Sequence, residues 1–369
     1  MLTYSCLKSH KNEYTFFDLL IATSSLSTGE PRDRLFALLN LPLVPYEWVP
    51  LPDYESSISE VMRSFTILDL FHNNSLRAMS WSCRGPGTTS SSSIRPSWVP
   101  DISNLRSPPV FTFVQYAREQ RSGGNTAVAP SIDEDQRILT IKGRQVFQIN
   151  SLGISRRVLY DINSCATPTT PADFEDAVVM AIELNWMDVC LARFYAANNC
   201  DTPEGVAQLI QLEVFNDFFR ALCCDWNPVE QTSPTTYVID LMKLAVLDLV
   251  MGQNNSDEHG AYRLLIAQGF TYKSRLCFLE DGHVGWAPAE AEVGGVVCVL
   301  NGSVAPFALR EIQDGTFRFV GECYVHGLVN GEILHLGKEE RDFVIQWKVL
   351  ETCSERASSE SNLAPFFCF

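Results

Sequence analysis

Residues 138–149 read ILTIKGRQVFQI, and this stretch decides the fold that the sequence predicts. Its side chains alternate with a period of two, which is typical of a β-strand. Gly143 interrupts the run and indicates either a pair of strands or one strand that bends at the glycine. The stretch is too isolated to bury its own faces. We therefore expect it to join strands beyond residue 260, and a structure in which it pairs with none of them would contradict this fold.

Those later strands are predicted over residues 262–350, where short alternating runs are separated by Gly, Asn and Asp. Spacing of this kind is typical of a small antiparallel β-barrel or sandwich. The runs are RLCFLEDGHVGWAP, VVCVLNGSVAPFALREI, TFRFVGECYVHGLVNGEIL and DFVIQWKVL. Their candidate core residues are Phe278, Trp286, Val297, Val299, Phe307, Leu309, Phe317, Phe319 and Tyr324.

Helical patterns separate the two strand regions. Thr170-Pro171 and Thr202-Pro203 each read as a helix N-cap followed by proline at the first helical position. They predict helices over about 171–198 and 203–224, and a third is predicted from about 235 to 251. The β-domain is therefore predicted to be discontinuous, covering residues 111–350 with strands at about 138–149 and 262–350 and a helical insertion at about 171–252.

Residues 1–110 are predicted to form a helical portion that precedes the β-domain. One helix is expected over residues 12–24, and a second begins at Pro31. Ser57 and Glu60 form a capping-box pair at the start of a third. Residues 84–96 are expected to form an exposed loop, and residues 97–101 an extended segment. Residues 118–136 are expected to be an exposed connection. The tail at 351–369 is expected to be frayed. The fold class is thus α+β.

Composition excludes several classes of partner. The chain has 369 residues with 28 Lys and Arg against 44 Asp and Glu, a formal net charge of −16. This acidic balance repels phosphate backbones and anionic lipids, so we expect no nucleic acid and no membrane as partner. No apolar run approaches the ~18–20 residues that span a bilayer. The 12 Cys include no CxxC pair, which predicts reduced core thiols, no metal site and a cytoplasmic protein.

The usual motifs of catalysis and cofactor binding do not occur in the sequence. There is no GxGxxG, GxSxG or HExxH, and the nearest string to a phosphate loop, residues 331–339, is one residue too long and lacks the hydroxyl. We therefore predict no catalytic residue and no cofactor. Cys323 and His326 could be a nucleophile and its base, but positions three apart on a strand point to opposite faces. They are interpreted as a core thiol and a turn histidine.

A cluster of mixed charge lies beside two apolar helices near the start of the chain and contains Arg32, Asp33, Arg34 and Asp53. It could hold a partner surface or a phosphate. We favour a structural role, in which Asp33 pairs with an arginine and ties the two helices together, while Asp53 and Tyr54 anchor a loop. Two tryptophans that stand two residues before a proline are expected to pin strand ends into the core: Trp98 and Trp286.

The order of several short segments resembles the region C-terminal to the HET core in fungal heterokaryon-incompatibility (HET-domain) proteins. The segments are EPRDRLFALLNL (30–41), PDYESSISEV (52–61), RPSWVPDIS (95–103), ILTIKGRQV (138–146), RALCCD (220–225), EDGHVGWAP (280–288) and GECYVHGLVNGE (321–332). They cover almost the whole chain. The resemblance marks family-motif positions with structural or partner-surface roles: Pro31, Arg32, Asp33, Arg34, Asp53, Tyr54, Trp98, Pro100, Asp101, Gly321, Glu322, Tyr324, His326 and Gly327.

This resemblance implies a role in self/non-self recognition and programmed cell death after the fusion of unlike hyphae. The family's HET core carries a Trp-Gly motif and a DxxCINQ segment, and neither string occurs here. A truncated member is therefore implied, without the part to which the family's NAD cleavage is ascribed. A second departure is Gly294-Gly295, where the family usually has Gly-Asp before its VC-x-L strand. Loss of the core is expected to leave exposed apolar surface at Phe16, Leu20, Leu35 and Leu39.

The function predicted from these observations is a non-enzymatic regulatory or scaffold part of a heterokaryon-incompatibility protein. Its expected partners are proteins, other HET-type proteins among them, and the oligomeric state is open. The alternative hypothesis is a β-barrel module that binds a peptide or a small ligand. A third hypothesis is a cryptic Cys-dependent hydrolase. We expect that the chain alone cleaves no NAD and does not kill the cell that expresses it.

Overall fold

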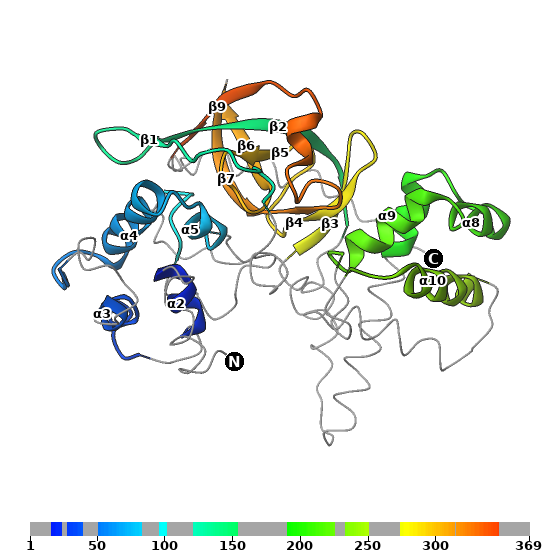
Figure 1. The fold of residues 1–369 in the computed structure, drawn as a ribbon, viewed down its shortest axis with the longest axis horizontal. Helices are drawn as coiled ribbons and strands as arrows, with labels where there is room; N and C mark the ends of the chain where they lie inside the picture. The colour runs from blue at the N-terminus through cyan, green and yellow to red at the C-terminus, as the bar shows by residue number, and fades with distance from the viewer. Residues whose placement is uncertain are drawn as a thin grey trace, which may run out of the picture.

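The structure is a computed structural model that describes residues 16–23, 28–39, 51–82, 96–101, 121–153, 190–225, 233–250, 274–313 and 315–346. Within these residues, helices come first and a nine-stranded mixed sheet follows, with more helices between its second and third strands (Figure 1). The fold is therefore α+β, as predicted. The sheet closes into a ring, but it is not the regular antiparallel barrel that we expected, because β7 and β9 are parallel.

The strands follow the order β5-β6-β7-β9-β2-β3-β4-β8, and β5 also pairs with β2 and so closes the ring. Their bounds are β1 Ser131–Ile132, β2 Leu139–Leu152, β3 Ser274–Leu279, β4 Val284–Pro288, β5 Val296–Leu300, β6 Phe307–Gln313, β7 Thr316–Glu322, β8 Tyr324–Val325 and β9 Glu340–Ile345. A short 3₁₀ helix, η5 Glu332–His335, precedes β9.

The strand β2 connects the closed part of the sheet, formed with β5, β6, β7 and β9, to the strands β3, β4 and β8. Its first half pairs with β9, its middle with β5 and its end with β3. Gly143 and Arg144 are paired on both sides, because β9 lies along one edge of β2 there and β5 lies along the other edge. The stretch at 138–149 is thus one bent strand rather than a pair, and it joins strands beyond residue 260, as predicted.

Glycine is needed at the bend of β2. A Cβ at Gly143 would lie 2.7 Å from the carbonyl oxygen of Val299 and 2.9 Å from the Cα of Leu300. Both atoms belong to the backbone of β5, so they cannot turn aside as a flexible side chain would. The missing side chain therefore lets β2 and β5 approach closely enough to close the ring.

Three clusters of buried apolar side chains fill the described structure, and the strands divide them. Alternate residues of β5 face two clusters: Val297 lies in the central cluster, and Cys298 lies in the N-terminal cluster beneath α2–α5. In β3, Cys277 lies in the central cluster, whereas Phe278 lies in the helical cluster beneath α8–α10. The central cluster includes Val146, Ile149, Leu279, Val299, Ala308, Val320, Cys323 and Val325. All nine core candidates predicted from the strand pattern are at most 5% exposed.

The N-terminal helices cover one side of the ring (Figure 1). They are α2 Phe16–Ala22, α3 Asp33–Leu39, α4 Ile58–His72 and α5 Arg77–Ser80. The capping box at α4 is confirmed, because the Ser57 hydroxyl accepts from the Glu60 N–H and the Glu60 carboxylate accepts from the Ser57 N–H. The second helix begins at Asp33 and not at Pro31, since Pro31 belongs to the turn in which the Asp33 N–H reaches the Glu30 carbonyl.

The prediction of an exposed apolar surface on these helices is wrong. Leu20, Leu35 and Leu39 are at most 5% exposed, and the ring of Phe16 stacks on Phe65 of α4 with 4.8 Å between centroids. The helices turn their apolar faces toward one another and toward the sheet. These faces are therefore buried within the chain itself.

The inserted helices lie on another side of the ring (Figure 1). Residues 190–197 are helical, and α8 Pro203–Leu209, α9 Glu213–Leu222 and α10 Thr236–Val250 follow. Thr202 caps α8 with its hydroxyl, as predicted. The prediction of a single helix over 203–224 is wrong, because the helix is interrupted before Leu212, whose backbone is extended (φ −82°, ψ 156°). The break lets both α8 and α9 bury an apolar face in the helical cluster.

Two connections also differ from prediction. Residues 97–101 form a turn rather than an extended segment. In this turn, the Ser97 hydroxyl accepts from the Phe319 N–H and donates to the Gln346 carbonyl. Residues 121–124 are not an exposed connection, because their backbone is hydrogen-bonded to the loops after β5 and β8, and Ser122 is fully buried. The segment 84–95, the Thr170-Pro171 cap and the tail 351–369 lie outside the described residues, and the domain limits proposed above stay predictions.

Candidate functional site

The N-terminal motif residues form a connection between α3 and the loop before α4. The Arg32 guanidinium binds the Glu30 carboxylate at 2.8 Å and donates to the carbonyl oxygens of Tyr54 and Ser56. The Tyr54 hydroxyl donates to the Asp33 carboxylate at 2.7 Å. The predicted tie between the two helices therefore exists, but it runs through Arg32 and through the Asp33–Tyr54 hydrogen bond.

Asp53 is a loop anchor, as predicted. Its carboxylate accepts from the backbone N–H groups of Glu55 and Ser56 at 2.8 and 3.1 Å. Hydrogen bonds with Ser56 and Glu55 lower the pKa of Asp53, and the hydrogen bonds from Arg32 lower the pKa of Glu30 in the same way. These carboxylates are therefore occupied in shaping the loop.

The motif around Trp98 is part of the core. Trp98 is fully buried in the N-terminal cluster, Pro100 is buried and Asp101 is half-buried. Ser97 bridges β7 and the end of β9. The expectation that Trp98 anchors strand ends agrees with this placement.

Three motifs that are distant in sequence meet where α9 packs on the ring. RALCCD ends α9, EDGHVGWAP contributes β4, and GECYVHG contributes the end of β7 and β8. The indole N–H of Trp286 donates to the Ala221 carbonyl at 2.8 Å. His326 lies 3.7 Å from the Asp217 carboxylate through Nε2 and 3.4 Å from the Tyr324 hydroxyl through Nδ1. We call this meeting point the α9 junction.

The chain leaves α9 through an unusual turn. Cys224 and Asp225 both have φ of 53°, a left-handed conformation that is rare for residues other than glycine. The turn is held by Asp225, whose carboxylate pairs with Arg220 and accepts from the Ser233 hydroxyl at 3.0 Å. Two adjacent residues in this conformation need such support from their surroundings.

Charge and burial oppose each other at His326. Burial lowers the pKa of this imidazole and Arg220 adds to the effect, whereas the carboxylates of Asp225 and Asp217 act in the opposite direction. The side chain of His326 lies with Tyr324 on the side of α9, and Cys323 lies in the central cluster. The pair Cys323 and His326 is therefore divided by the strand, as its spacing predicts.

The remaining motif positions shape the backbone of this region. Gly321 pairs with Ala308 next to a register shift between β6 and β7, and Glu322, which pairs with Phe307, is 2% exposed. Gly327 has φ of 81° in the turn after β8, beside the ring of His283. His283 itself pairs with Asp281 in the turn between β3 and β4.

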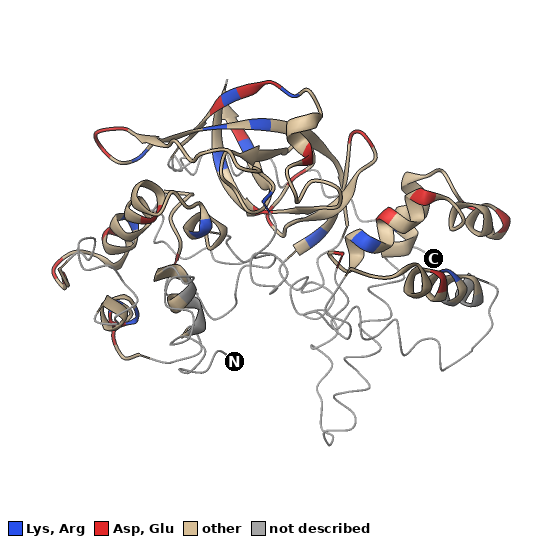
Figure 2. Ribbon diagram, viewed as in Figure 1, with Lys and Arg blue, Asp and Glu red and all other residues tan. Residues whose placement is uncertain are grey.

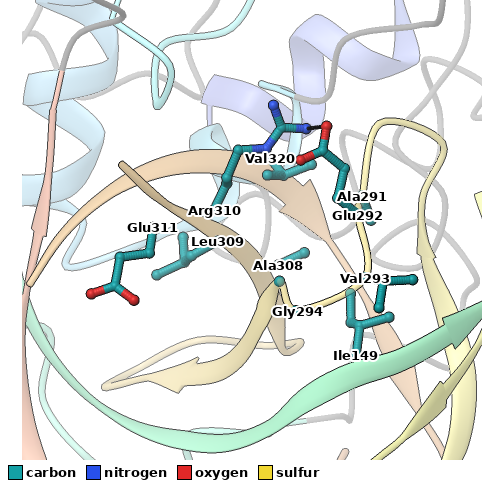
Figure 3. Close-up of a pocket in the computed structure, with 11 residues that line it drawn as sticks. Ile149, Ala291, Glu292, Val293, Gly294, Ala308, Leu309, Arg310, Glu311 and Val320 are labelled. Atoms are coloured by element: carbon teal, nitrogen blue, oxygen red, sulfur yellow. Dashed lines mark ion pairs between the residues drawn. The ribbon is translucent and has the colours of Figure 1, made fainter. Parts of the chain in front are cut away.

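A cavity of about 260 Å³ opens beside β6 and is formed by β2, the turn between β4 and β5, β6 and β7 (Figure 3). Ile149, Ala308 and Val320 belong to the central cluster and line its apolar part. The Arg310 guanidinium pairs with the Glu292 carboxylate at its edge. Gly294 and Gly295, the pair noted as a departure from the family, form the rim.

Residues 214–345 match the family model described as the Het-6 beta-barrel domain. This part of the chain is similar to a Het-6 β-barrel domain. This domain is found in fungal heterokaryon-incompatibility proteins, which agrees with the resemblance and with a C-terminal region of such a protein. No curated protein and no solved structure matches the chain. The matched range begins in α9 and ends with β9, so β2, which closes the ring, precedes it.

The sequence did not identify every residue of the α9 junction. RALCCD and GECYVHG were recognised as motifs, but Asp217 and Asp225 were not named as site residues. The cavity residues Arg310 and Glu292 were also missed, because Arg310 lies in β6 whereas Glu292 lies in the turn between β4 and β5. The glycine pair at its rim was the one signal in the sequence that pointed to this place.

Positive and negative side chains are interspersed over the elements of the described structure (Figure 2). Among the described residues, no group of three or more His, Cys, Asp or Glu side chains is arranged to hold a metal ion. A search of the same residues finds no helix with the length and apolar character needed to cross a bilayer.

Proposed function

We propose that this chain acts in fungal heterokaryon incompatibility as a non-enzymatic regulatory or scaffold part, through contacts with proteins. The observation that carries the proposal is the α9 junction. There Trp286 of segment 280–288 donates to the Ala221 carbonyl of segment 220–225, and Asp225 pairs with Arg220 of its own segment and accepts from the Ser233 hydroxyl. Motif residues that hydrogen-bond within the chain stabilise the surface of the junction, and a protein partner could recognise the shape of that surface.

The chemistry of the described thiols supports the same proposal over a Cys-dependent hydrolase. A cysteine nucleophile needs an accessible thiolate with a lowered pKa. Burial instead raises the pKa of Cys277 to about 12 and raises the pKa values of Cys190, Cys224 and Cys298 as well. These four thiols are therefore protonated and enclosed at neutral pH.

We further propose that the partners are other HET-type proteins and that the meeting takes place in the cytoplasm, where the contents of fused hyphae mix. A protein-binding role needs neither nucleic acid nor a membrane, which suits the net charge of −16. The ligand-binding alternative has a specific observation in its favour, the cavity beside β6.

The experiment has a chemical arm and a cellular arm. The purified chain is incubated with NAD, and the full chain is expressed in fungal hyphae with and without a full-length HET protein. We expect NAD to stay intact, hyphae expressing the chain alone to stay viable, and the incompatibility response of the full-length protein to change in strength. NAD turnover that one carboxylate or cysteine substitution abolishes would overturn the non-enzymatic role.

A matched pair of variants connects the cellular effect to the α9 junction. Asp225→Asn removes the carboxylate that holds the turn after α9, whereas Asp240→Asn removes an exposed carboxylate from α10 that pairs with Lys243. We expect the first variant to weaken the effect on the full-length protein and the second to leave it unchanged. Equal effects of the two variants would contradict a role for the junction.

A further inference from the structure

We infer that the cavity beside β6 binds a carboxylate carried by a compact apolar group. This chemistry occurs in the C-terminal residue of a peptide and in small free acids. The inference is independent of the role proposed above, because it rests on the cavity and not on the α9 junction.

The apolar part of the cavity defines the size of the group. Ile149, Ala308 and Val320 extend the central cluster to the surface, and Val293, which is 65% exposed, stands at the opening (Figure 3). The volume of about 260 Å³ lies just below the range of roughly 300–1,000 Å³ that drug-sized ligands occupy. The space therefore suits one branched or aromatic side chain.

The charged wall of the cavity is the guanidinium of Arg310. One of its terminal nitrogens donates to the Glu290 carbonyl at 3.2 Å, and the Glu290 carboxylate receives Arg318 at 3.4 Å. The Nε atom of Arg310 is buried and has no acceptor among the residues that the structure describes. The guanidinium is thus held in place while its hydrogen-bonding edge is only partly used. A planar carboxylate is the group that this edge recognises best.

The carboxylate of Glu292 indicates the kind of ligand group that pairs with Arg310. Its carboxylate pairs with Arg310, yet its side chain is 59% exposed and stands on the turn that ends at Gly294 and Gly295. An exposed ion pair of this kind contributes little to stability, so an incoming carboxylate can replace it. The other carboxylate of the lining, Glu311, points away from Arg310 (Figure 3) and accepts from the Gly315 N–H at 3.1 Å. Glu292 is therefore an internal stand-in for the ligand.

The binding test compares acids with their amides on the full chain by calorimetry and ligand-detected NMR. The probes are 4-methylpentanoate against 4-methylpentanamide, and acetyl-Gly-Leu with a free C-terminus against the same peptide amidated. We expect at least one acid to bind and its amide to bind at least about tenfold more weakly. Binding of the peptide alone identifies a C-terminus as the source, and binding of the free acid identifies a small molecule. If neither acid binds, or if the amides bind equally well, the inference is wrong.

Four variants test the roles of the side chains. Arg310→Met should weaken binding of the acid at least about tenfold, and Val293→Glu, at an exposed position, should weaken it by placing a like charge at the opening. Glu292→Gln should tighten binding by about two- to fivefold, because the internal competitor is removed. Glu134→Gln removes an exposed carboxylate that lies outside the cavity lining; it is the matched control and should change affinity less than about twofold. Circular dichroism verifies that each variant is folded, and weaker binding by Glu292→Gln or unchanged binding by Val293→Glu would overturn the inference.

Discussion

Replacement of Trp286 by phenylalanine tests how strongly the inserted helices are fastened to the ring. Trp286 is fully buried between α9 and β4, and its indole N–H donates to the Ala221 carbonyl at 2.8 Å. The lost hydrogen bond contributes about 0.5–1.5 kcal/mol, since Ala221 keeps the Cys224 N–H as a donor. The void left by the smaller ring adds about 1–2 kcal/mol. We therefore expect Trp286→Phe to lower the free energy of unfolding by about 1.5–3.5 kcal/mol.

Trp98→Phe is the matched control. Trp98 is also fully buried, but its indole N–H has no acceptor among the described residues. The substitution leaves a similar void and removes a buried donor that was unsatisfied, so the two effects oppose each other and we expect a loss of about 0–1 kcal/mol. Urea unfolding followed by circular dichroism measures both variants. Equal losses of stability would refute the importance that we assign to the Trp286–Ala221 hydrogen bond.

Three further predictions concern stability. Gly143→Ala should cost about 1–3 kcal/mol, because its Cβ meets the backbone of β5, whereas Gly29→Ala, in open space, should be nearly neutral in the same urea assay. Ser57→Ala should lower the free energy of unfolding by about 1 kcal/mol through loss of the α4 cap, measured by the shift of the urea midpoint. Burial lowers the pKa of His326 in the folded chain, so the unfolded chain binds the proton more readily and stability should fall as pH drops from about 6.5 toward the folded pKa. Urea titrations at several pH values measure the dependence of the free energy of unfolding on pH. His326→Gln should reduce this pH dependence and His72→Gln should retain it. An unchanged pH dependence in His326→Gln would contradict the assignment of the effect to His326.

Local patterns in the sequence predicted the elements better than their connections. The alternation at 138–149 indicated a strand that needs partners, and Ser57 with Glu60 marked the start of α4, because these signals lie within a few residues. The break at Leu212 could not be seen in the same way. The apolar pattern continues through it, and the break is favoured only by packing of α8 and α9 in the helical cluster.

The candidate site shows the same division between local and distant information. Opposite charges close together in the sequence predicted a tie through Asp33 and an arginine, whereas the structure pairs Arg32 with Glu30 and Asp33 with Tyr54. His326 and Asp217 are more than one hundred residues apart, so only the folded chain brings them to 3.7 Å. Arg310 and Glu292 likewise approach each other because β5 and β6 are neighbours in the sheet.

The pairing of β2 on both edges has a consequence for how the chain is made on the ribosome. Between Leu139 and its partner Ile345 lie 345 − 139 = 206 positions, so β2 is synthesised long before β9. At about 5–20 residues per second, that interval lasts about 10–40 s. Helices α8 to α10 can form from local contacts during the wait, while both edges of β2 stay open to any other strand they meet. Release of the last strand from the ribosome is then the event that allows the nascent chain to protect itself from aggregation.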